Sequence, residues 1–91
     1  MYAVFVATNI DDFGQARASL HDTVIPTVSG LPGFVSGVWL APENGESGEG
    51  NSVVVFDSED AARTMADRLK TNPPPNVEIR RAEVRPVAGT A

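Results

Sequence analysis

Hydrophobic and polar residues alternate in four short stretches of the chain, a pattern typical of β-strands. These stretches are residues 2–8, 34–40, 51–56 and 77–87, and Gly, Pro, Asn or Asp residues flank them. Two further segments lie between the first and second stretches and between the third and fourth. Their apolar residues recur at steps of three and four, which predicts amphipathic helices. The order of elements is therefore β-α-β-β-α-β.

The first predicted helix starts at Phe13 and runs for roughly four turns, to about Val28. Asp11 or Asp12 is expected to cap it, because a short acceptor side chain satisfies the free N–H groups of a first turn. Pro26 falls inside the apolar pattern and removes one helical N–H. The helix is therefore expected to kink there, or to stop and resume as a short turn.

The second predicted helix opens at Asp57-Ser58, which supply its cap. The stripe of apolar residues that it buries consists of Ala62, Met65, Ala66 and Leu69. Residues 41–50 are polar, acidic and rich in glycine, so they are expected to form a mobile hairpin loop. Residues 71–76 include three consecutive prolines and predict a stiff extended connector.

This order of elements predicts an α+β protein of the ferredoxin-like type. Four antiparallel strands would form one sheet, with both helices on the same face. A chain of 91 residues has room for one core. Residues 1–88 are therefore expected to form a single domain, and residues 89–91 a frayed tail.

Both faces of the predicted sheet carry apolar side chains. Two helices cover only one face, so the other would leave an apolar patch in water. A homodimer that packs sheet against sheet, a dimeric α/β barrel, would cover it. A different protein as partner is the alternative. The alternation places Val4 and Val6 opposite Ala3, Phe5 and Ala7; Val53 and Val55 opposite Val54 and Phe56; and Phe34, Val38 and Leu40 opposite Val35 and Trp39.

Composition excludes several classes of site. The chain has no Cys and one His, so disulfides and thiolate or His-rich metal sites are excluded within one chain. Its net charge of −5 argues against nucleic acid as a partner. No segment approaches the ~20 apolar residues of a membrane span. The absence of Cys and of a signal-like N-terminus leads us to expect a cytoplasmic protein that holds no metal.

Four segments carry a resemblance to a known group of families. They are 24–26 (VIP), 31–34 (LPGF), 37–39 (GVW) and 53–62 (VVVFDSEDAA). The run resembles the antibiotic-biosynthesis-monooxygenase-like families, over about residues 2–70. The resemblance implies a dimeric α/β barrel. These families include cofactor-free oxygenases that act on polyphenolic substrates, haem-binding proteins and members without known activity.

Three side chains are candidates for a site in the space between helices and sheet. His21 is the only side chain that titrates near neutral pH, and it would act there as a catalytic base. Phe34 and Trp39 would line the ligand pocket and stack on a small aromatic ligand. The haem-binding members use a histidine or an equivalent ligand on a helix that lines the cavity. The second helix here has none, so no cofactor is expected.

Two functional hypotheses remain open from the sequence. The first is a small-molecule-handling protein, a cofactor-independent monooxygenase-like enzyme in which His21 is the base. The second is a dimeric ligand-binding or regulatory module without catalysis. It is favoured because no second group is evidently placed to orient His21.

Overall fold

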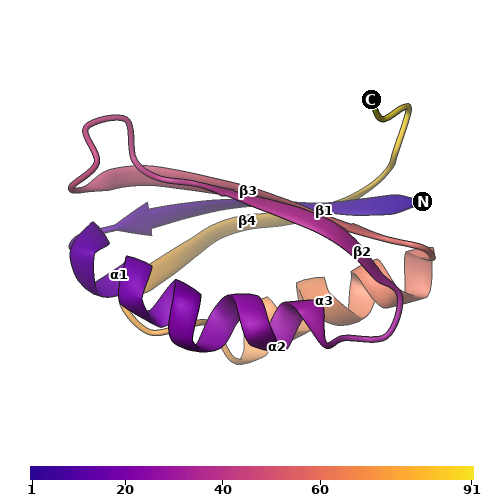
Figure 1. Ribbon diagram of the computed structural model, residues 1–91, viewed down its shortest axis with the longest axis horizontal. Coiled ribbons are helices and arrows are strands. Elements are labelled where there is room, and N and C mark those ends of the chain that lie inside the picture. The colour runs from indigo at the N-terminus through magenta and orange to yellow at the C-terminus, as the bar shows by residue number, and fades with distance from the viewer.

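The computed structural model describes all 91 residues and has the predicted order of elements. The strands are β1 (Tyr2–Ile10), β2 (Phe34–Leu40), β3 (Gly48–Phe56) and β4 (Val77–Pro86). They form one antiparallel sheet in the order β2-β3-β1-β4. Two helical rods pack under one face of this sheet (Figure 1). The ferredoxin-like α+β prediction is confirmed.

The first rod has three helical segments: α1 (Phe13–Ser19), the π-helix η1 (Leu20–Val24) and α2 (Ile25–Ser29). Asp12 caps it by accepting a hydrogen bond from the Gln15 N–H at 3.2 Å. The rod does not stop at Pro26 and restart as a separate turn, because η1 runs directly into α2. The N–H of Ile25 donates to the carbonyl of Leu20, five residues back, and this widened turn accommodates the proline.

The second rod is α3 (Glu59–Thr71), with Ala62, Met65 and Ala66 buried as its stripe predicts. Ser58 alone caps it, accepting from the Ala61 N–H at 3.2 Å. Asp57 does not cap the helix, contrary to the sequence prediction. Its backbone N–H donates to the Gly33 carbonyl at 2.8 Å, and this bond ties the end of β3 to the turn before β2.

A bulge near the start of β2 corrects one prediction about the faces of the sheet. The pairing with β3 shifts register between Phe34 and Ser36. Phe34 therefore lies on the helix-facing side together with Trp39, and not with Val38 and Leu40 as simple alternation predicts. The pairing of β1 with β4 also shifts register, between Ala7 and Thr8. This shift leaves one extra residue in β4 and changes which of its residues share a face.

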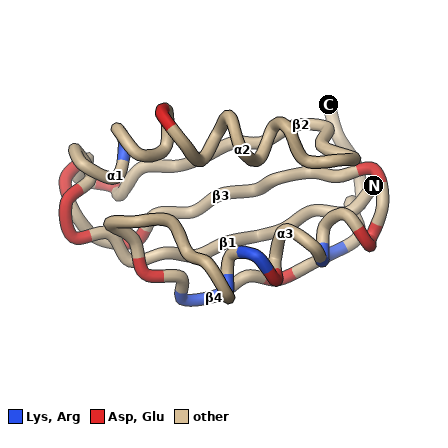
Figure 2. The backbone as a smooth tube through the Cα atoms, turned by 90° about the horizontal axis from the view of Figure 1, so that it is seen from below, with Lys and Arg blue, Asp and Glu red and all other residues tan.

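The core occupies one half of the space between helices and sheet. The three largest fully buried side chains, Val4, Val54 and Phe56, lie there, and Phe34 packs edge-on against Phe56 with ring centroids 6.2 Å apart. The other half, beside the second half of β1, is not filled. Figure 2 shows the two rods side by side across the sheet, with acidic residues concentrated at the two ends of the molecule. No helix is long and apolar enough to cross a lipid bilayer.

Candidate functional site

A cavity of about 510 Å³ lies between the α1–η1–α2 rod and the sheet. This volume falls in the range of small-molecule sites, roughly 300–1,000 Å³. Fifteen of its 24 lining residues are hydrophobic, so its walls can exclude water from an apolar ligand. Every strand and every helix contributes to the lining. The α3–β4 connector adds Pro74 and Pro75.

Small side chains at helix-facing positions create the space above β2 and β3. Gly37 and Ser52 both line the cavity, where larger residues would fill it. A Cβ atom at Gly37 would lie 2.8 Å from Cη2 of Trp39, so the indole ring lies directly over the glycine. The backbone at Gly37 thus forms a seat for this ring, and the ring forms one wall of the cavity.

The mouth of the cavity lies between the first rod and the edge strand β2. On these two elements, the exposed lining residues are Arg17 and His21 of the rod and Gly37, Val38 and Leu40 of the strand. The side chains of Val38 and Leu40 point to the opposite face of the sheet, so the polar groups here come from the rod. Arg17 makes no ion pair, and the ring of His21 makes neither a hydrogen bond nor an ion pair. The mouth therefore presents a free guanidinium and a free imidazole to an entering molecule.

The structure brings together two of the three residues proposed from the sequence. Trp39 and His21 both line the cavity, the first on its wall and the second at its mouth. Phe34 is not a lining residue, because it packs into the core against Phe56. Sequence reasoning missed Ser52, which lines the cavity from the centre of the sheet. The signal was available, since a polar residue here shares the helix-facing parity of Val54 and Phe56.

The structure holds no cluster of three or more His, Asp or Glu side chains suited to a metal ion. In the sequence, the acidic residues closest to the residues of the mouth lie in the first rod and in the β2–β3 hairpin. Only one acid, Asp22, lies in the rod between residues 13 and 29. The interior of the cavity thus offers apolar contact, aromatic stacking and a few neutral hydrogen-bonding groups, and Arg17 adds a positive charge at the mouth.

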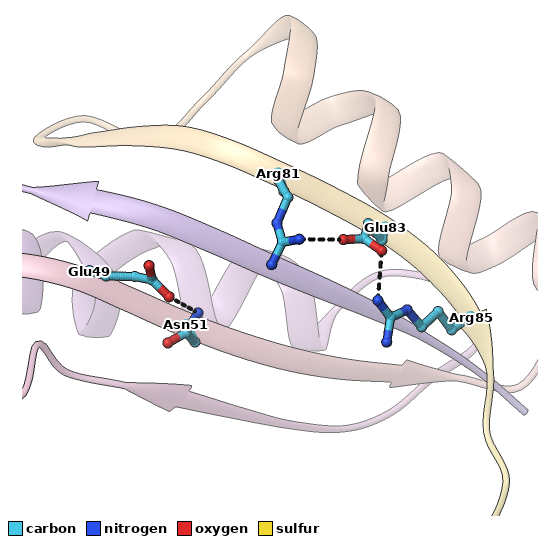
Figure 3. A network of polar contacts seen from close by, with 5 residues as sticks. All are labelled: Glu49, Asn51, Arg81, Glu83 and Arg85. Atoms are coloured by element: carbon cyan, nitrogen blue, oxygen red, sulfur yellow. Dashed lines mark hydrogen bonds and ion pairs between the residues drawn. The ribbon is translucent and has the colours of Figure 1, made fainter.

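The opposite face of the sheet divides into an apolar part and a charged part. Val53 and Val55 of β3 lie beside Phe5 and Ala3 of β1, and Val38 and Leu40 of β2 are 52% and 55% exposed. The charged part is a row on β4, in which Arg81 and Arg85 flank Glu83 (Figure 3). We call the whole surface the open face.

Within the row, Glu83 accepts a hydrogen bond from Arg85 at 2.8 Å and pairs with Arg81 at 3.3 Å. The hydrogen bond from Arg85 and its positive charge hold the pKa of Glu83 below its usual value, and the charge of Arg81 adds to this. Both guanidinium groups also lie over the ring of Phe5, at 5.6 and 6.0 Å from its centroid. The row therefore keeps one excess positive charge, and its guanidinium groups are held against the apolar part.

Comparison with known proteins assigns a fold and no family. Neither the protein-family models nor the curated proteins give a match to the sequence. Among solved structures, the chain is similar to HapK from Hahella chejuensis, with a TM-score of 0.68. The two share 12% sequence identity, over all of this chain and 96% of HapK. The class that these observations define is a small ferredoxin-like α+β protein with a cavity under its sheet.

Proposed function

We propose that this protein binds a small, mainly apolar, ring-containing molecule in the cavity between its first helical rod and its sheet. The observation that carries the proposal is the cavity itself. A packed protein interior has few voids larger than a water molecule, so a space of about 510 Å³ between helices and sheet is unusual and has the size of a small-molecule site. Walls that are apolar and include the indole of Trp39 suit an aromatic ring system.

A saturation experiment with 1-naphthol tests this proposal. The chain has a single tryptophan, so its fluorescence reports on ligand beside Trp39 alone. We expect saturable quenching with one site per chain. Val24 lines the cavity, so Val24→Phe should fill part of it and weaken binding several-fold. Val35 lies outside the lining, and Val35→Phe serves as the matched control. Quenching that never saturates, or that both variants weaken equally, would contradict the proposal.

A cofactor-independent monooxygenase-like activity is the second candidate. It is favoured by His21, whose imidazole at the mouth of the cavity could take a proton from a bound phenolic substrate. Binding without catalysis is favoured by the lack of any group that orients the imidazole. His21→Ala separates the two: an enzyme should lose oxygen uptake while retaining bound ligand. A variant that keeps full uptake would remove His21 from catalysis.

We also propose that the chain is related to the antibiotic-biosynthesis-monooxygenase-like families. The support is the coincidence of their motif with the fold: the Leu-Pro-Gly-Phe segment is the turn into β2, and the Asp-Ser-Glu-Asp-Ala-Ala segment opens α3. Both segments serve structure, through a turn and a cap, so the relationship by itself chooses no activity. The cytoplasmic location stays a prediction.

A second copy of this chain is our proposed partner for the open face. With strands about 4.8 Å apart and a rise of about 3.3 Å per residue, four strands of seven residues cover roughly 19 by 23 Å. Two such faces bury on the order of 1,000 Å² in total, the lower range of specific interfaces. The apolar part would form the centre of a two-fold interface, and the Arg81–Glu83–Arg85 row its polar rim.

Light scattering after gel filtration tests the dimer. A dimer has twice the 9.6 kDa of the chain. Val53 pairs with both Phe5 and Val38 at the centre of the open face, so Val53→Glu should shift the particle to the mass of one chain. Gln15→Glu places the same charge on the exposed surface of the first rod and should leave the mass unchanged. A wild-type particle of one chain mass at micromolar concentration would refute the dimer.

A further inference from the structure

Ser52 is the only polar side chain in the buried set, with 6% of its surface exposed. It lies in the middle of β3, paired with Val6 of β1 on one side and with Trp39 of β2 on the other. All three residues line the cavity. Ser52 therefore occupies the floor of the cavity, at the centre of the sheet and next to the indole wall.

The hydroxyl of Ser52 has no hydrogen-bond partner in the protein. Every polar side-chain atom that is sealed from solvent in this protein has a hydrogen-bond partner. The hydroxyl must then open onto the cavity. Thr8, the other hydroxyl on this side of the sheet, differs because it donates to the Gly50 carbonyl at 3.0 Å. The hydroxyl is therefore free to form a hydrogen bond with a molecule in the cavity.

We propose that Ser52 is the hydrogen-bonding anchor of the ligand site. It selects a neutral ring system that carries one hydrogen-bonding oxygen or nitrogen. This inference rests on the proposed ligand-binding function and adds to it the residue that sets specificity. The body of the ligand must be uncharged, because the charged lining residue Arg17 is exposed at the mouth and no charged side chain is buried. The adjacent indole of Trp39 provides the surface on which the ring stacks.

Naphthalene and 1-naphthol test the assignment, because they differ by one hydroxyl on the same ring system. The dissociation constant of each is measured for the wild type and for Ser52→Ala. The ratio of the naphthalene value to the 1-naphthol value should fall about three- to tenfold in the variant, the worth of one hydrogen bond. Ser52→Thr keeps a hydroxyl and should preserve most of the wild-type ratio. Ser36→Ala removes an exposed hydroxyl from β2 and should leave the ratio unchanged.

Thermal unfolding of each variant verifies that it folds. Ser52→Ala removes a group without a protein partner, so its melting temperature should match or exceed that of the wild type. An unchanged ratio in Ser52→Ala, with both probes still bound, overturns the role of Ser52 and leaves the binding cavity standing. Failure of both probes to bind the wild type overturns the binding cavity and the anchor together.

Discussion

The contact between Gly37 and the indole of Trp39 gives a quantitative prediction for Gly37→Ala. The added Cβ would lie 2.8 Å from Cη2 and 2.9 Å from Cζ3 of the ring. Carbon atoms pack without repulsion at about 3.5–4.0 Å, so the ring must retreat by roughly 0.7 Å or more. The open space beside the ring is the cavity that it lines.

Two terms set the change in stability. Overpacking of this kind costs about 1–3 kcal/mol, whereas replacing Gly by Ala inside a strand gains about 0.5–1 kcal/mol. Because the ring has an open space to enter, we expect the lower end of the cost, so the net loss in the free energy of unfolding should be at most about 0.5 kcal/mol. The cavity loses volume, so the affinity for 1-naphthol should fall by a larger factor than the stability change alone would suggest.

Fluorescence of the single tryptophan measures the displacement, and urea denaturation measures the stability. We expect a shifted emission maximum and altered quenching by acrylamide in Gly37→Ala. A Cβ at Gly89 would meet nothing within 4 Å, so Gly89→Ala is the control and should match the wild type. Emission and quenching in Gly37→Ala identical to those of the wild type would refute the stacking of the ring on residue 37.

Two further predictions concern the caps and charges of the fold. Ser58→Ala removes the side-chain cap of α3 and should lower the free energy of unfolding by about 1 kcal/mol in urea denaturation, whereas an equal loss from the exposed Ser36→Ala would argue against capping as the cause. Arg85→Ala should raise the pKa of Glu83, followed by NMR of its carboxyl carbon, since the hydrogen bond and charge that lower this pKa are gone. The wild-type contribution of Glu83 to stability should be present above its ordinary pKa of 4.5 and disappear as the pH falls through the lowered native value, and a pKa unmoved by Arg85→Ala would contradict this.

Much of the fold could be predicted from the sequence, because local signals and global packing agree. The step of three and four in residues 59–71 and the cap at Ser58 define α3, and alternation defines the helix-facing residues of β1. The same reasoning fails in β2 because of its bulge. An extra residue inverts the parity of every residue beyond it, and no turn signal marks it, so alternation alone predicts the wrong face for Phe34.

The candidate site could be predicted only in part. His21 and Trp39 stand out by residue type, but the space between them depends on what is missing, namely side chains at Gly37 and Ser52. Cavities arise from small residues that the fold brings together across strands, and spacing along the chain does not reveal such pairs. The π-turn before Pro26 is similar: the proline marks a perturbation, and the contacts of the whole rod decide its form.

The central claim, that the cavity receives a ring-containing molecule, is tested most directly by nuclear Overhauser effects between bound 1-naphthol and the methyl groups of the protein. We predict contacts from the ring protons to Ile10, Ile25 and Ile79, which line the cavity. Contacts confined to Val53 and Val55 would place the molecule on the open face instead, and would contradict the account.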